Sequence, residues 1–232
     1  MTEREKQLLL AIITEHIRHS RPVGSKVIVE KYLKDISSAT IRNDMIELER
    51  VGLIEQPHTS AGRIPTTKAY EYYVANFLPE RELDKTEQQK LQRILSAHRG
   101  QYGLVIRELA KAVADLSSVA VIVGFAPRDS YYTGLSNLFR QPEFAEIDLI
   151  QNFSQIVDHL DEVMEEIFPR IRPRVEILLG KHNPFGQTCG VLLTKYGGGK
   201  IPAGMFGILG PIRMPYERHR ALLEYTRNLL SK

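Results

Sequence analysis

Residues 37–66 read SSATIRNDMIELERVGLIEQPHTSAGRIPT, and this stretch decides the fold of the first third of the chain. Its first half has apolar residues at helical spacing, which predicts a helix with one buried stripe. These residues are Ile41, Met45 and Leu48. The pair Ser37-Ser38 offers a cap for the start of this helix, and Gly52 suits the position just after its end.

The second half of the stretch predicts a β-hairpin. Two short runs, at 53–56 and 63–65, enclose a polar tip at 57–62 that contains proline and glycine. Short strands joined by a polar, glycine-containing tip are typical of a hairpin.

Two helices are expected before this stretch and one after it. Thr2 and Glu5 have the spacing of a capping box at the start of a first helix, and Ser25 is placed to cap a second, short one. A further helix is expected from 66 to about 78. Three helices followed by a hairpin are the order of elements in a winged helix-turn-helix, so such a domain is predicted over residues 1–78.

The third helix of this predicted domain is the candidate for insertion into the major groove of duplex DNA. Outside its buried stripe, the residues near its start are polar: Ser38, Thr40, Arg42 and Asn43. Arginine can bond guanine bidentately and asparagine can bond adenine likewise, while serine and threonine can bond phosphates or base edges. For Ser38 the favoured role is capping of the helix. An alternative is that the winged helix serves only as a protein–protein module.

The hairpin tip is the candidate wing. Its polar and cationic residues are His58, Thr59, Ser60 and Arg63. These residue types suit a wing that lies along the DNA backbone, with Arg63 reaching a phosphate or the minor groove.

The rest of the chain predicts a linker and a second domain. Residues 79–117 are rich in Glu, Lys, Gln and Arg at their start and are interpreted as a helical linker. From 118 to 232, helical and strand-like segments alternate, so the whole chain is assigned to the α+β class. Helices are expected at 104–116, 144–167 and 215–230, and strands at 119–123, 175–179, 190–194 and 201–209.

Composition adds few constraints on function. The 232 residues carry a net charge of +3 at pH 7, which is too small to reveal a nucleic-acid partner by itself. The single cysteine, Cys189, excludes an internal disulfide and any multi-cysteine zinc site, and it is interpreted as a core residue. The polar N-terminus is unlike a signal peptide, and no apolar stretch approaches the roughly 18–20 residues of a membrane span. A cytoplasmic location is expected.

An enzyme is the rival class, and the sequence offers little support for it. The run Gly197-Gly198-Gly199-Lys200 lacks the earlier glycine and the following Ser or Thr of a phosphate-binding loop, so a hairpin turn is expected there. The carboxylates at 161–166 are interpreted as a solvated helix face. The seven histidines show no metal-binding spacing. We therefore predict no catalytic residues, no metal and no cofactor.

Three parts of the chain closely resemble the family of the heat-inducible transcription repressor HrcA. The first comprises residues 22–25, 37–45 and 48–66, the second is GILGPIRMPY at 207–216, and the third is GLSNLFRQPEF at 134–144. The first match is long and much more specific than a generic helix-turn-helix.

This resemblance implies a function and a set of partners. It implies a repressor of chaperone operons that binds an inverted-repeat operator in double-stranded DNA as a homodimer. It also implies a chaperonin partner, in whose absence family members lose repressor activity. The alternative is a DNA-binding or adaptor protein without this chaperonin-linked regulation.

The resemblance also implies a GAF-like second domain with a separate dimerising segment inserted in it. Family members run about a hundred residues longer than this chain, in line with three domains. Here the strand at 119–123 is followed, after only the residues 127–130, by the region 131–144. The expected architecture is therefore a winged helix-turn-helix, a helical linker and a reduced GAF-like regulatory and dimerisation domain over 118–232.

Overall fold

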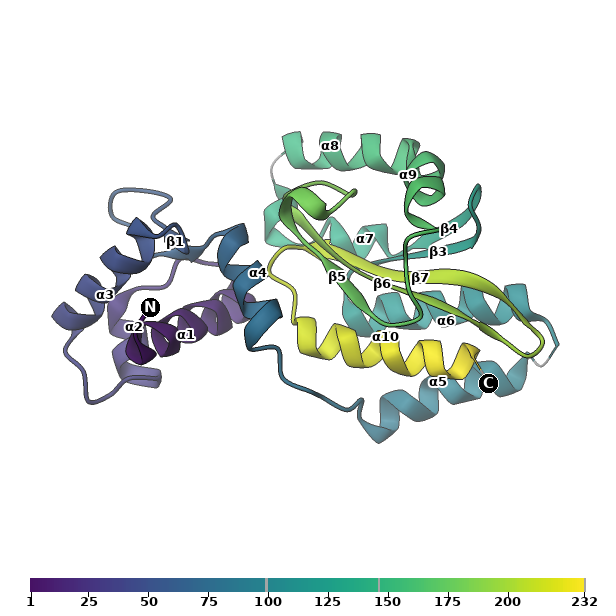
Figure 1. The fold of residues 1–232 in the computed structure, drawn as a ribbon, viewed down its shortest axis with the longest axis horizontal. Helices are drawn as coiled ribbons and strands as arrows, with labels where there is room; N and C mark the ends of the chain where they lie inside the picture. The colour runs from purple at the N-terminus through teal and green to yellow at the C-terminus, as the bar shows by residue number, and fades with distance from the viewer. Residues whose placement is uncertain (99, 146, 232) are drawn as a thin grey trace. The chain divides into compact units, whose positions relative to one another are not determined.

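The structure, a computed structural model, describes residues 1–98, 100–145 and 147–231. The chain divides into two compact units, Met1–Leu78 and Pro79–Lys232 (Figure 1). Within the described ranges, no helix has both the length and the apolar character needed to cross a membrane.

The first unit consists of helices around a short hairpin. Its elements are α1 (Glu3–His19), α2 (Ser25–Lys31), α3 (Ser38–Arg50), β1 (Ile54–Glu55), β2 (Ile64–Pro65) and α4 (Thr67–Asn76). The two strands pair antiparallel, with Ile54 opposite Pro65. The apolar stripes of the helices meet in one core, which includes Leu8, Leu9, Ile12, Ile28, Ile41, Leu48 and Tyr70.

Local signals in the sequence set the ends of these helices. Thr2 and Glu5 form the predicted capping box, in which each side chain accepts a hydrogen bond from the other residue's backbone N–H. Helix α3 ends in a Schellman motif, because the N–H of Leu53 bonds to the carbonyl of Leu48 at 3.0 Å. Gly52 takes the left-handed conformation that this motif requires, with φ of +73°. The predicted start of the first helix and the predicted start and end of the third are confirmed.

A buried carboxylate joins α1 to the residues at the end of α2. Glu15 is 4% exposed, and it accepts hydrogen bonds from Lys31 Nζ at 2.9 Å and Tyr32 Oη at 2.8 Å. Burial alone would raise the pKa of Glu15, but the bonds from Lys31 and Tyr32 and the charge of Lys31 outweigh it and lower that pKa. The carboxylate therefore stays charged inside the unit.

The second unit is built around an antiparallel sheet. Its elements are α5 (Lys85–Ala97), α6 (Tyr102–Ser117), β3 (Ala120–Ala126), β4 (Asp129–Thr133), α7 (Leu135–Leu138), α8 (Ile147–Asp158), α9 (Leu160–Ile167), β5 (Glu176–Leu178), β6 (Cys189–Gly198), β7 (Ile201–Pro211) and α10 (Tyr216–Leu230). Among the described residues the sheet has five strands in the order β4-β3-β7-β6-β5.

Helices cover both faces of this sheet. In Figure 1, α7, α8 and α9 lie on one side, while α6 and α10 lie on the other and α5 packs against those two. Because strand side chains alternate between faces, one set packs under α8 and α9 and the next set faces α6 and α10. The first set comprises Ala120, Ile122, Val191, Leu193, Met205 and Leu209, which form one core with Phe153, Leu160 and Met164.

Two segments far apart in the sequence meet in this unit. Arg213, just after β7, donates a hydrogen bond to Glu143 Oε2 at 3.1 Å and another to Gln141 Oε1 at 3.0 Å. Arg213 is 8% exposed, so a charged pair is held in a mostly buried position. The motif at 134–144 and the motif at 207–216 thus form one structural cluster.

The structure differs from the sequence-based expectations in three places. Residues 79–117, expected to form a linker, form α5 and α6 and belong to the second unit, because α6 packs on β3. The strand β4 was not predicted. Ser25 is the first residue of α2 and not its cap, which is Gly24.

Candidate nucleic-acid interface

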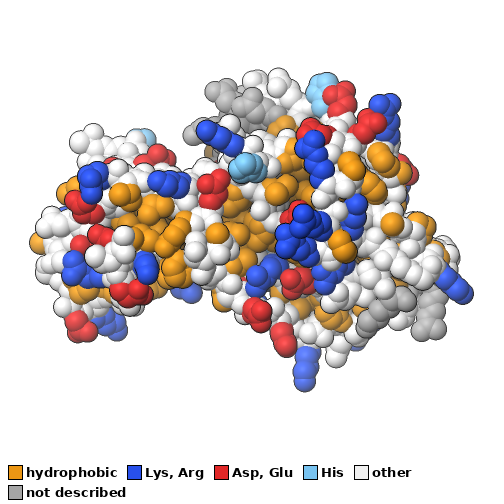
Figure 2. Space-filling model, viewed as in Figure 1, with side chains coloured by type: hydrophobic (Ala, Val, Ile, Leu, Met, Phe, Trp, Pro, Cys, Tyr) orange, Lys and Arg blue, Asp and Glu red, His pale blue; other side chains and the backbone are white. Residues whose placement is uncertain are grey.

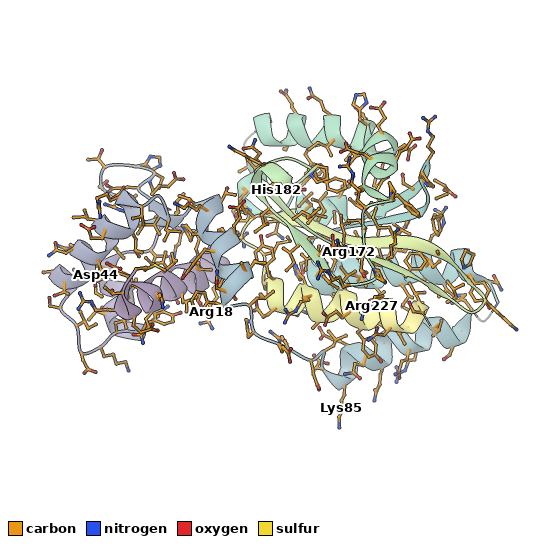
Figure 3. The ribbon with its side chains drawn as sticks, viewed as in Figure 1. Arg18, Asp44, Lys85, Arg172, His182 and Arg227 are labelled. Atoms are coloured by element: carbon orange, nitrogen blue, oxygen red, sulfur yellow. The ribbon has the colours of Figure 1, made fainter. Side chains whose placement is uncertain are left out.

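Helix α3 presents a polar face to solvent. Its inner side is held in the core by Ile41, Met45 and Leu48. Asp44, labelled in Figure 3, lies on the inner side too and accepts hydrogen bonds from Arg4 at 2.6 and 2.9 Å, which fixes α3 to α1. Arg42 and Asn43 are exposed. The two residues with the best chemistry for base recognition therefore lie on the outer face of the helix.

The hydroxyl groups at the start of α3 are mostly engaged within the unit. Ser37 is the cap, and its Oγ accepts a hydrogen bond from Thr40 N at 3.1 Å and lies 2.9 Å from Thr40 Oγ1. Ser38 Oγ lies 2.8 Å from Ser25 Oγ, which joins α3 to α2. Ser25 Oγ also accepts a long hydrogen bond, 3.3 Å, from Arg42 Nε. Ser38 therefore links two helices, and Ser25 orients the Arg42 guanidinium.

The hairpin tip is held together by one side chain. Gln56 Nε2 donates to the carbonyl oxygens of Thr59 and Ala61, each at 2.9 Å. The N–H of Ala61 bonds to the carbonyl of His58 at 2.9 Å, which closes the turn. His58, Thr59 and Ser60 are all exposed. The structure therefore places these three predicted wing residues at the surface of a hydrogen-bonded loop.

Arg63 has a different environment from the other predicted wing residues. Its Nη2 lies 3.0 Å from Glu49 Oε2 on α3, and its side chain is only 17% exposed. Its backbone pairs in both directions with Val23, at 2.8 and 2.9 Å. A Cβ on the neighbouring Gly62 would lie 2.5 Å from the carbonyl group of Val23, so only glycine permits this close approach. Arg63 thus anchors the hairpin to α3 and to the segment before α2.

A hollow of about 350 Å³ separates the hairpin tip from the helices. Arg42 and Ile46 line it from α3, Ser60 and Gln56 from the hairpin, and Ser25 from α2. Of the residues predicted to contact DNA, Arg42, Ser60 and Arg63 therefore line one concave surface in the first unit.

Charge in the first unit is balanced, not concentrated. Residues 1–78 contain 11 Lys and Arg against 10 Asp and Glu. Figure 2 shows cationic and acidic side chains interspersed on the visible face of this unit. Because Glu15, Asp44 and Glu49 are paired within the unit, their charges are largely neutralised. Attraction to a polyanion then depends on exposed cations such as Arg42, which lies on the outer face of α3 near its start.

The second unit contains the residues that the sequence analysis weighed for catalysis or phosphate binding, and each has a structural explanation. Cys189 is 3% exposed, and burial raises the pKa of its thiol to about 11, as expected for a core residue and not for a nucleophile. Gly197–Lys200 forms the predicted turn between β6 and β7. The carboxylates of α9 lie at the surface, where Arg128 pairs with Glu165 at 2.9 Å. In the part of the chain that the structure describes, no group of three His, Cys, Asp or Glu side chains could hold a metal ion.

Four residues of this surface were not predicted from the sequence. Ser25 orients Arg42, Gln56 holds the hairpin tip, Glu49 pairs with Arg63, and Ile46 is exposed on α3. The contacts of the first three join segments that only the folded chain brings together. The exposure of Ile46 had a sequence signal, because it lies outside the stripe formed by Ile41, Met45 and Leu48.

Comparison with known proteins gives matches over most of the chain. The family model described as "HrcA protein C terminal domain" matches residues 37–219. A protein of Pelotomaculum thermopropionicum, named "Heat-inducible transcription repressor HrcA", is 34% identical over 168 residues, which cover 72% of this chain and 48% of that protein. This chain thus aligns with about half the length of that relative.

A second relative aligns along its full length. The protein of Carboxydothermus hydrogenoformans with the same name is 24% identical over 332 positions, covering 99% of this chain and 97% of that protein. Since this chain has 232 residues, about 100 of those 332 positions have no counterpart in it. A crystal structure described only as that of a hypothetical protein has a TM-score of 0.73 and 20% identity, covering 100% of this chain and 96% of that one. That likeness shows a shared fold.

Proposed function

The chain belongs to the HrcA family, whose curated members are named heat-inducible transcription repressors, and we propose that it represses transcription by binding duplex DNA through its first unit. In this proposal residues 1–78 are a winged helix-turn-helix, α3 is the recognition helix and the segment from β1 to β2 is the wing. The order of helices and hairpin and the hollow between α3 and the hairpin support this assignment.

The observation that carries the proposal is the exposure of Arg42 and Asn43 on the outer face of α3. Other polar residues of this helix have partners inside the unit, since Asp44 pairs with Arg4 and Ser38 with Ser25. We assign base reading to Arg42 and Asn43, because their side chains match the major-groove edges of guanine and adenine.

The remaining predicted residues take backbone and positioning roles in this proposal. Thr40 lies in the first turn of α3, and the N-terminus of a helix suits a phosphate. His58, Thr59 and Ser60 are assigned to phosphate contacts along the wing. Ser38 and Arg63 act through other residues: Ser38 braces α3 against α2, and Arg63 holds the hairpin in place.

We further propose that the protein acts as a homodimer on an inverted repeat. A single recognition helix makes too few base contacts for operator-level specificity, and a repeat with two-fold symmetry calls for a two-fold protein. Residues 118–232, which we assign to a reduced GAF-like domain, are proposed to hold the self-association surface. Bound over a promoter, such a dimer would block transcription.

Membership of this family also supports the proposal of a regulatory partner. Because its members are named heat-inducible repressors, we propose that this protein controls chaperone genes and that a chaperonin restores its activity. Unoccupied chaperonin would then signal that few proteins need folding, and repression would follow.

The test is a nuclease footprint on DNA from upstream of the chaperone operon in the genome that encodes this chain. The full chain should protect a site with two-fold symmetry at nanomolar to micromolar concentrations. A variant with both Arg42→Ala and Asn43→Ala should lose this protection, whereas Glu71→Ala, an exposed change on α4, should keep it. Uniform protection of all sequences, or protection that the double variant retains, would contradict the proposal.

A further inference from the structure

Helix α3 carries an apolar side chain that the fold leaves in solvent. Ile46 is 54% exposed, the largest value among the large exposed hydrophobic side chains of the described residues. The others are Met1, Val51, Leu104 and Tyr132, at 40% to 49%. Folding therefore leaves half of this isoleucine without an apolar partner.

The position of Ile46 on the helix is specific. It follows Asn43 by three residues and Arg42 by four, and residues at these spacings are neighbours on a helix surface. The core side of α3 is occupied by other residues, so Ile46 lies on the outer face together with the proposed base-reading pair. It also lines the hollow between α3 and the hairpin tip, opposite Ser60.

Helix stability does not explain an isoleucine here. At an exposed helix position a β-branched residue has lower helix propensity than alanine, and it adds apolar surface to water. A binding partner with an apolar group at this place would explain both its presence and its exposure. In the major groove the base-edge group of this kind is the C5 methyl of thymine.

We propose that Ile46 is a specificity-determining residue that contacts a thymine methyl group in the operator. This inference rests on the proposed DNA-binding function. Arg42 and Asn43, one turn nearer the helix start, read polar base edges, and Ile46 reads an apolar one beside them. The three side chains together would select a guanine or adenine next to a thymine.

The experiment compares thymine with uracil, which differs from it by that methyl group. A duplex that binds the full chain tightly is selected from a random-sequence pool and prepared once with thymine and once with uracil throughout. Affinities are measured on both duplexes for the unaltered protein, for Ile46→Ala and for Val51→Ala. Val51 is the matched control, because it is a β-branched residue at the end of the same helix, 44% exposed, and does not line the hollow.

The inference predicts a coupling between the side chain and the methyl group. Uracil should lower the affinity of the unaltered protein about four-fold for each contacted methyl, which is the effect of burying one such group. Ile46→Ala should lose a similar factor on thymine DNA and respond little to uracil. Val51→Ala should respond to uracil as the unaltered protein does. The salt dependence of binding should be the same for all three, because no phosphate contact changes.

The outcomes separate this inference from the proposed function. If the unaltered protein selects no sequence, the proposed function fails and the inference fails with it. If the protein binds its selected duplex but uracil weakens Ile46→Ala as much as the unaltered protein, Ile46 reads no methyl and only the inference is overturned. The inference is likewise overturned if Ile46→Ala changes the sedimentation of the free protein and leaves the response to uracil intact, because the side chain then serves a protein interface. Circular dichroism of each variant shows whether its helices are intact.

Discussion

The guanidinium of Arg63 and the carboxylate of Glu49 form an ion pair between the hairpin and α3, with Nη2 3.0 Å from Oε2. Arg63 Nε donates to the same oxygen at 3.1 Å. The pair neutralises a cation that would otherwise be available to a phosphate, and it fixes the hairpin to α3. Arg63 is thus better suited to positioning the hairpin than to contacting DNA itself.

Arg63→Ala and Glu49→Gln should therefore share an effect on stability and differ in their effect on DNA. Each should lower the free energy of unfolding by about 0.5–1 kcal/mol, since the pair is partly exposed. Glu49→Gln should tighten DNA binding because it removes an anion near the phosphates. Arg63→Ala should change the slope of log affinity against log salt concentration by less than the value of one phosphate contact. Urea unfolding and binding titrations at several salt concentrations measure both effects. If Arg63→Ala lowers that slope by the value of one full phosphate contact, Arg63 must leave Glu49 and bind a phosphate in the complex.

If Arg42 and Asn43 read bases, replacing either residue should lower the specificity of the protein for its operator. Arg42→Ala or Asn43→Ala should each cost about 1–3 kcal/mol on the operator and much less on random duplex. Arg50→Ala is the matched control, because Arg50 is also exposed on α3 but lies in its last turn, where it pairs with Glu47 at 2.9 Å. Titrations on both duplexes decide the matter. Equal losses on the two DNAs would place Arg42 among the phosphate contacts.

The close approach of the hairpin to the segment before α2 predicts that Gly62 is not replaceable. In Gly62→Ala the new methyl group would lie 2.5 Å from the backbone of Val23, so the hairpin must shift away. We expect a loss of about 1–3 kcal/mol in unfolding free energy, as for other overpacked sites, and weaker operator binding. Gly103→Ala is the control, since it adds the same methyl group in α6 of the second unit, where a Cβ meets nothing within 4 Å. Equal melting temperatures for the two variants would contradict this account of the hairpin.

The size of the second unit bears on how the proposed dimer assembles. About 100 positions of the full-length relative have no counterpart here, and a smaller chain offers a smaller surface for self-association. Interfaces below about 1,200 Å² tend to be weak and transient. We expect the free protein to be largely monomeric at low concentration and to dimerise on operator DNA, because the free energy of DNA binding also favours the dimer. Analytical ultracentrifugation with and without operator tests this, and a tight nanomolar dimer without DNA would contradict it.

Much of this fold could be predicted because its signals are local. The capping box at Thr2, the serine cap of α3 and the glycine after it are set by a few neighbouring residues, and all three formed as expected. Strand β4 escaped prediction because it is a short edge strand, held by pairing with β3 across an irregular turn. Its exposed residues, Asp129 and Tyr132, are separated by two half-buried ones, so the strand lacks a strict alternation in its sequence and depends on packing against β3, α6 and α9.

The candidate site was predicted in its residue types and less well in its contacts. Arg42 and Asn43 are exposed as the apolar stripe of α3 implied. The pairing of Arg63 with Glu49, 14 positions away, depends on how the hairpin folds back on α3. The link between Ser25 and Ser38 depends likewise on the packing of α2 against α3. Such contacts have no periodicity in the sequence, so they become visible only in the structure.

Acid should destabilise the second unit through His219. This residue of α10 is fully buried, and burial, with a smaller contribution from the charge of Arg218, lowers the pKa of its imidazole to about 3. In the unfolded chain the ring takes up a proton near its ordinary pKa of 6.5, whereas in the folded protein it stays neutral. Unfolding therefore consumes a proton between these two values. The stabilising contribution is complete above the unfolded pKa and is lost progressively as the pH falls from it toward the folded pKa.

His219→Leu should reduce this dependence on pH. The unfolding free energy of the unaltered protein should fall between pH 7 and pH 5, with up to about 1.4 kcal/mol per pH unit due to this one proton. The leucine variant should lose less over the same interval, whatever its stability at pH 7. Replacement of His182, which is exposed and labelled in Figure 3, by glutamine should leave the loss unchanged, because solvent surrounds that ring in both states. Urea unfolding at the two pH values measures the difference, and an equal loss in the unaltered protein and in His219→Leu would show that the buried imidazole is not the acid-sensitive group.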